Sequence, residues 1–201
     1  MDKFTKEDLE LIQKIENQAR DMQFKYRGCS QASLLALQEN LKIGDTTSFK
    51  AAGALATGIA GKGVGPCGAL IGGMMAIGIE FGRAAVEEAG GPREGGESNY
   101  TRTFKLCGEL YDKFKEYYKG DVSCWHIQEI FYEKLKLHPE LGPEPYYNSA
   151  CPEMQPLKET GEFYNILAEK ACHVVAVGAR LAAEIILRER KVDAEKGKHV
   201  F

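Results

Sequence analysis

Three cysteines of this sequence stand where a helix is expected to begin. Cys29, Cys67 and Cys124 follow Gly28, Pro66 and Ser123, and each precedes an apolar segment. The first turn of a helix has unpaired N–H groups and a partial positive charge, which favour a thiolate over a thiol and lower the pKa of the cysteine. Because thiolates ligate metal ions and attack disulfides, this placement indicates redox or metal chemistry. The alternative is that small residues suited to burial fall at these positions by chance.

A fourth candidate, Cys172, lies in the last segment with a helical pattern. The four cysteines are separated by 38, 57 and 48 residues, unlike the short C-x-x-C pairs of zinc ribbons and ferredoxin loops. The spacing therefore indicates no particular metal, but it allows four helices to bring their thiols into one bundle interior. Small residues beside Cys67 and Cys172 leave room for a bulky group or for a closely packed helix; they are Gly68, Gly72, Gly73, Ala76, Ala168, Ala176, Ala179 and Ala183.

The other two cysteines have less defined roles. Cys107 shares an apolar helical stripe with Phe104, Tyr111 and Phe114, which favours a position in the core. Cys151 precedes Pro152 in an irregular segment. It could be a spare thiol, a substitute ligand or a resolving cysteine, and the sequence leaves these roles open.

Two histidines lie next to candidate ligands in the sequence. His126 is two residues after Cys124, and His173 adjoins Cys172. Adjacent helical positions point about 100° apart, so His173 cannot easily share a site with Cys172. We expect both histidines at the surface or behind a ligand, where an imidazole can bond to a sulfur and tune its potential.

Composition narrows the possible classes of protein. With 201 residues, of which 44% are hydrophobic, the chain is long enough for one domain with a real core. The net charge is −3 and no basic stripe alternates with aromatic residues, so we expect no nucleic-acid partner. The N-terminus is charged and lacks the apolar region of a signal peptide. We therefore expect a cytoplasmic protein whose cysteines are reduced thiols or metal ligands.

One glycine- and alanine-rich segment approaches the length of a membrane helix. Residues 63–79 contain no charged residue, and a membrane span needs about 20 apolar residues. The segment has few large apolar side chains, however, and its two Gly-x-x-x-Gly pairs serve close packing in a soluble bundle equally well. We expect a buried helix and no membrane insertion.

Apolar residues recur at intervals of three and four along the chain, and no segment shows sustained alternation. This pattern predicts an all-α fold, a compact bundle of about six to seven helices in a single domain. The first follows the capping box Thr5-Lys6-Glu7-Asp8, is ended by Gly28, and has the stripe Leu11, Ile15, Ala19, Met22 and Tyr26. The others span about 29–41, 47–60, 67–89, 100–119, 124–137 and 161–190. Residues 1–190 form the helical domain, with a Pro-rich irregular insertion at 138–160, and 191–201 form a charged tail.

The motif residues resemble a known family. Cys67-Gly68-Ala69-Leu70-Ile71-Gly72 matches a C-G-A-x-x-G motif, and Cys29-Ser30-Gln31-Ala32 resembles the helix start found upstream of it. With single cysteines following at 124 and 172, the sequence from about residue 28 to 186 resembles the redox-active family labelled C_GCAxxG_C_C. The resemblance implies that Cys29, Cys67, Cys124 and Cys172 carry the chemistry. A related module of split-Soret cytochromes implies a cysteine-bound iron–sulfur centre, and the family makes a homodimer plausible.

Three functions remain open at this stage. The first is an electron-transfer protein in which Cys29, Cys67, Cys124 and Cys172 hold one iron–sulfur cluster of the [2Fe–2S] type and which serves an unknown redox partner protein. The second is a thiol–disulfide protein that uses the same cysteines without metal. The third is a helical interaction protein in which the cysteines bind a structural zinc ion or belong to the core. Whether the protein is an enzyme stays open.

Overall fold

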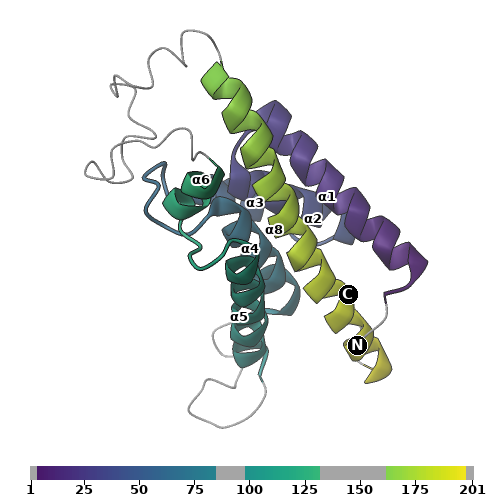
Figure 1. Cartoon of the computed structure of the whole chain (residues 1–201). Helices are drawn as coiled ribbons and strands as arrows, with labels where there is room; N and C mark the ends of the chain where they lie inside the picture. The colour runs from purple at the N-terminus through teal and green to yellow at the C-terminus, as the bar shows by residue number, and fades with distance from the viewer. Residues whose placement is uncertain (1–3, 85–97, 132–161, 198–201) are drawn as a thin grey trace.

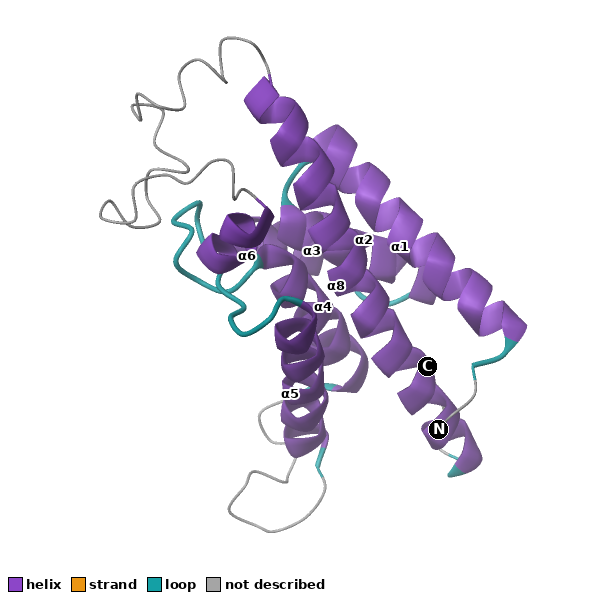
Figure 2. Cartoon of the chain, viewed as in Figure 1, coloured by secondary structure: helices purple, strands orange, loops and turns teal. Residues whose placement is uncertain are grey.

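In a computed structural model, which describes residues 4–84, 98–131 and 162–197, the chain is built from helices (Figures 1 and 2). Seven α-helices and one 3-10 helix occur in these ranges, and none of them contains a strand. The α-helices are α1 (Lys6–Tyr26), α2 (Cys29–Leu41), α3 (Thr46–Ala52), α4 (Gly68–Phe81), α5 (Asn99–Tyr117), α6 (Cys124–Phe131) and α8 (Glu162–Glu195). The 3-10 helix η1 spans Gly53–Leu55. The structure thus confirms the predicted all-α, single-domain bundle. The expected insertion and Cys151 lie outside the described residues.

The longest helix, α8, organises the bundle. It packs against α1, α4, α2 and α5, and Figure 1 shows it running diagonally between α1 on one side and α5 on the other. Its small residues Ala176, Ala179 and Ala183, predicted to lie near Cys172, are buried, and the side chain of Ala168 lies outside the described residues. The helix ends five residues beyond the predicted position. Lys191 in that extension pairs with Asp8 at the start of α1.

The first helix forms as its sequence predicts. The Thr5 hydroxyl accepts a hydrogen bond from the Asp8 N–H (3.2 Å), and the Asp8 carboxylate accepts one from the Thr5 N–H (2.7 Å), which closes the capping box. Ile15 and Ala19 of the expected stripe are buried. Tyr26 of the same stripe is 79% exposed. It is the last residue of the helix.

Glycines allow the central helices to approach closely. A Cβ atom added at Gly72 of α4 would lie 2.4 Å from the Ser30 carbonyl oxygen of α2, and one added at Gly178 of α8 would lie 2.9 Å from the Ala69 carbonyl oxygen of α4. Both distances are too short for any side chain, so α2, α4 and α8 touch backbone to backbone at these points. In the part of the chain described here, no helix is both long and apolar enough to cross a membrane.

The structure differs from the sequence prediction at three places. The helix expected at 67–89 ends at Phe81, because the backbone is extended at Gly82. The helix expected at 47–60 ends at Ala52, because after η1 the backbone has positive φ at residues 57–61 and leaves the helical region. On α5 the buried face consists of Leu106, Leu110 and Phe114, whereas Phe104 is 63% exposed. The true stripe is therefore displaced on the helix, and Cys107 lies at its edge, half-buried.

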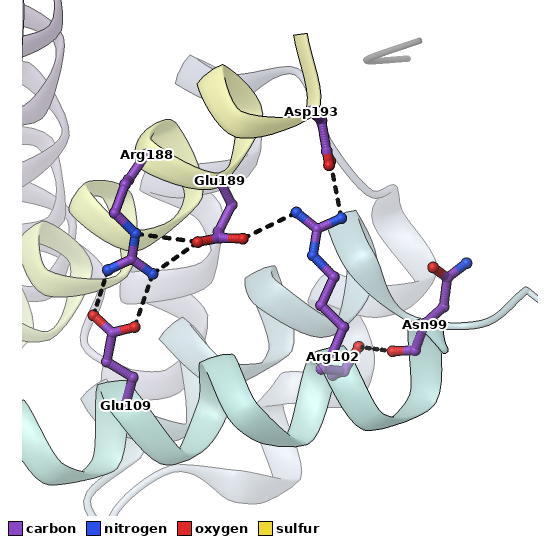
Figure 3. Close-up of polar contacts among 7 residues, drawn as sticks. Asn99, Arg102, Glu109, Arg188, Glu189 and Asp193 are labelled. Atoms are coloured by element: carbon purple, nitrogen blue, oxygen red, sulfur yellow. Dashed lines mark hydrogen bonds and ion pairs between the residues drawn. The ribbon is translucent and has the colours of Figure 1, made fainter. Parts of the chain in front are cut away.

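Ion pairs join the C-terminal part of α8 to α5. The Arg188 guanidinium of α8 donates two hydrogen bonds to the Glu109 carboxylate of α5, at 2.6 and 2.8 Å, and two more to Glu189, at 2.9 and 3.1 Å (Figure 3). The Arg102 guanidinium of α5 forms ion pairs with two carboxylates of α8, at 2.9 Å from Asp193 and 3.1 Å from Glu189. These paired, partly buried charges fix α5 against α8.

The pair between Glu109 and Arg188 should make stability depend on pH. Two hydrogen bonds from Arg188 hold the pKa of Glu109 below its usual value. Its contribution is therefore complete above the pKa of an unfolded glutamate, about 4.3, and is lost as the pH falls through the lower folded value. Glu109→Gln should lower the free energy of unfolding by about 1 kcal/mol at pH 7, and the difference from the unmodified protein should shrink below about pH 4. Urea denaturation across this range measures it.

The matched control is Glu116→Gln, on the exposed side of the same helix. It should change the unfolding free energy little at any pH. A Glu109→Gln deficit that stays constant down to pH 3 would contradict the assigned role of the pair.

Candidate thiol centre

Two loops pair through the backbone and bring two of the predicted cysteines together. The Cys67 N–H donates to the Val122 carbonyl (2.8 Å), and the Cys124 N–H donates to the Gly65 carbonyl (2.9 Å). These bonds flank an isolated bridge between Pro66 and Ser123. The loops are the teal segments beside α6 in Figure 2. The start of α4 and the start of α6 therefore meet.

A local cap orients the first turn of α6. The Asp121 carboxylate accepts hydrogen bonds from the N–H and the hydroxyl of Ser123, at 3.0 and 2.8 Å. The Ser123 hydroxyl in turn accepts the His126 N–H at 3.3 Å, as an N-cap residue does. These bonds make Ser123 the N-cap of α6 and fix its N-terminal end, where Cys124 is the first helical residue.

The third cysteine reaches the same place from α2. Cys29 is the first residue of α2, and its sulfur accepts a hydrogen bond from the Thr57 N–H at 3.3 Å. A Cβ added at Gly68 would lie 2.3 Å from this sulfur, so Cys29 packs directly on the residue that follows Cys67. Cys67 itself is the N-cap of α4. All three cysteines thus occupy the helix starts that the sequence predicts. They are also neighbours, an arrangement with which the sequence was compatible but which it did not predict.

Burial, and not the helix termini, decides the charge state of these thiols. Burial raises the pKa of Cys29 and raises that of Cys67 well above its ordinary value; for Cys67, the nearby Cys29 and Cys124 raise it further. Backbone N–H groups of Thr57 and Ser30 at Cys29, and of Ala69 and Leu70 at Cys67, act in the opposite direction. The prediction of lowered pKa values was wrong for these two residues, since removal from water outweighs the helix termini.

Three further residues at the centre were not found from the sequence. Tyr118 is buried, and its pKa is raised first by that burial and then by the charge of Cys67. The Gln128 side-chain amide donates to the Cys124 sulfur at 2.9 Å. At Gly58, which has φ +66°, a Cβ would lie 2.8 Å from the Cβ of Cys124. Only the spacing of four between Cys124 and Gln128, one helical turn, could have indicated one of these contacts.

Cys172 is buried on α8 and faces α1. Burial raises its pKa, and the nearby charges that act on it are those of Arg20 and Asp21, both on α1. The following residue, His173, contacts the Tyr117 hydroxyl through Nε2 at 3.3 Å. Cys172 thus lies on the α1 side of α8, one residue from a histidine that contacts α5.

The other candidates lie outside the centre. The thiol of Cys107 donates a long hydrogen bond, 3.8 Å, to the Met74 carbonyl. His126 contacts the Tyr118 carbonyl through Nε2 at 3.3 Å. Within the described ranges no three His, Cys, Asp or Glu side chains are gathered closely enough to hold a metal ion. The centre is therefore a set of neighbouring thiols.

Fold and site together define a helical protein with a buried thiol centre built at the starts of three helices. A comparison with protein-family models matches residues 28–170 to the family described as "Putative redox-active protein (C_GCAxxG_C_C)". Because the match covers most of the 201 residues, the chain belongs to this family. The match includes Cys29, Cys67 and Cys124 and ends two residues before Cys172. A comparison with curated proteins and one with solved structures each gave no match.

The contact between Gly68 and Cys29 gives a test of the centre's packing. Gly68→Ala should place a methyl group against the Cys29 sulfur and lower the free energy of unfolding by about 1–3 kcal/mol. Gly78→Ala, on the same helix but with nothing within 4 Å of the added Cβ, should instead raise it by up to about 1 kcal/mol. Urea denaturation under reducing conditions measures both. Equal stability of the two variants would show that the sulfur and Gly68 are not in contact.

Proposed function

We propose that this protein is an electron-transfer protein in which Cys29, Cys67, Cys124 and Cys172 hold one iron–sulfur cluster of the [2Fe–2S] type. The observation that supports the proposal is the meeting of three cysteines, from three helix starts, around Cys67. When bound, the cluster would supply one-electron redox chemistry. The family, described as redox-active, has the same general chemistry.

By ligand type the thiols present suit such a group, and binding it would draw them closer together than they lie in the described residues. Thiolate sulfur is a soft ligand that prefers iron–sulfur clusters, zinc and Cu(I), and zinc has no redox chemistry. The buried thiols of Cys29 and Cys67 hold their protons at neutral pH, and coordination removes such protons. The N–H groups of Ser30, Thr57 and Ala69 point at the sulfurs and would offset the negative charge of the thiolates.

Cys172 is the proposed fourth ligand. It is buried, and it lies on α8, the helix that packs against both α2 and α4. From the Gly178–Ala69 contact, Cys172 is six residues nearer the start of α8, roughly 9 Å along the helix axis. It therefore lies toward the end of α4 that begins with Cys67.

A thiol–disulfide protein is the second candidate, because Cys67 has two cysteines as neighbours. Oxidation of a pair would form one S–S bond and release two protons and two electrons to an acceptor. The raised pKa of Cys67 slows thiol–disulfide exchange, which needs a thiolate, and coordination of a metal would have to remove the same proton.

Replacing Cys67 gives the decisive measurement. Protein purified without oxygen should be brown and contain iron and acid-labile sulfide, and Cys67→Ser should lose both because the central ligand is missing. Cys107→Ser is the control, since Cys107 lies apart from the centre against Met74, and it should keep its iron. A colourless, iron-free protein with all thiols titratable would overturn the proposal, and a stoichiometric zinc content would indicate the structural role.

A separate variant tests the fourth ligand. Cys172→Ser should lower the iron content or alter the absorption spectrum of the cluster, because serine replaces sulfur by a harder oxygen ligand. Its free energy of unfolding in the metal-free state should fall by less than about 2 kcal/mol. If the iron content, spectrum and potential all equal those of the unmodified protein, Cys172 is not a ligand.

A further inference from the structure

Gln128 lies one helical turn after Cys124 and donates its side-chain amide to the cysteine sulfur. The Nε2–Sγ distance is 2.9 Å, and the glutamine is half-buried. Both residues belong to α6, whose first turn is held by the Ser123 cap. Their spacing of four places the two side chains on one face of the helix, so the contact follows from the helix itself.

This hydrogen bond differs from those at the neighbouring cysteine. At Cys67 the donors are backbone N–H groups of Ala69 and Leu70, which any sequence with this fold supplies. At Cys124 the donor is a side chain that this particular sequence provides. A glutamine amide is neutral, so it stabilises negative charge on sulfur without adding a counter-charge to the buried site.

From this geometry we infer that Gln128 is a positioning residue that orients the Cys124 sulfur and sets the reduction potential of the centre. The inference rests on the proposed function. Reduction of a bound cluster would add one electron, and hence one negative charge, to the centre that Cys124 helps to hold. A hydrogen bond to a sulfur stabilises the more negative state, and therefore raises the potential.

Two substitutions separate this electrostatic role from simple packing. Gln128→Leu removes the donor, and Gln128→Glu keeps the shape but replaces the amide by a carboxylate that only accepts hydrogen bonds. If Gln128 only filled space, the similarly shaped glutamate would be the milder change. If it stabilises charge on sulfur, glutamate is the more severe change, because its negative charge opposes that of the thiolate.

The experiment is a redox titration of the iron-loaded protein under argon, followed by its visible spectrum. The midpoint potential should fall from the unmodified protein to Gln128→Leu and fall further in Gln128→Glu, while iron per chain in Gln128→Leu stays unchanged. Gln13→Leu, an exposed position on α1, should keep the original potential. Equal potentials in Gln128→Leu and the unmodified protein overturn the inference and leave the proposed function intact.

A second measurement does not depend on the cluster. In the metal-free, reduced protein, iodoacetamide should alkylate Cys124 several-fold more slowly in Gln128→Leu, because the thiolate that reacts has lost its donor. Mass spectrometry of the Cys124 peptide gives the rate. Absence of iron with a slower rate would overturn the proposed function while supporting the contact between Gln128 and the sulfur. Equal rates would overturn that contact.

Discussion

Negative charge on three neighbouring sulfurs is the constraint that the rest of the centre must satisfy. Burial and the other two cysteines both raise the pKa of Cys67. Its thiolate form is therefore unfavourable unless hydrogen-bond donors or a positive charge stabilise it. The structure supplies N–H groups at each sulfur: from Thr57 at Cys29, from the first turn of α4 at Cys67, and from Gln128 at Cys124. Without a metal these donors reduce the cost of charge but do not remove it. Under the proposed function, a bound metal would supply the remaining compensation.

Close packing of backbones is what allows the sulfurs to meet. Gly68 has no space for a side chain because the Cys29 sulfur occupies it, and Gly72, one turn later, touches the backbone of α2. The two glycines of the C-G-A-x-x-G motif are therefore required for packing. Gly68 leaves space for the Cys29 sulfur, and Gly72 leaves space for the backbone of α2. A larger residue at either position would push α2 and α4 apart and would move Cys29 away from Cys67. The motif and the thiol centre are one structural unit.

The sequence predicted local features well and assembly poorly. Helix starts at Cys29, Cys67 and Cys124 depend on neighbouring residues such as Gly28 and Ser123, so their positions were predictable. That these starts meet depends on two loops pairing through the backbone between residues 63–67 and 122–125, for which side chains give no signal. The pKa error has the same origin, because helix termini can be located from sequence whereas burial of a thiol depends on the assembled bundle.

The turn at residues 57–61 has an unfavourable backbone conformation that contacts with the rest of the bundle maintain. Positive φ is costly for β-branched residues, yet Thr57 has φ +58° and Ile59 has φ +66°. The turn persists because its surroundings hold it: the Gly58 carbonyl accepts the Gly65 N–H at 3.1 Å, and Gly58 lies against Cys124 with no room for a Cβ. In this conformation the Thr57 N–H points at the Cys29 sulfur. Strained backbone of this kind clusters at functional sites, and this turn contacts two of the three cysteines.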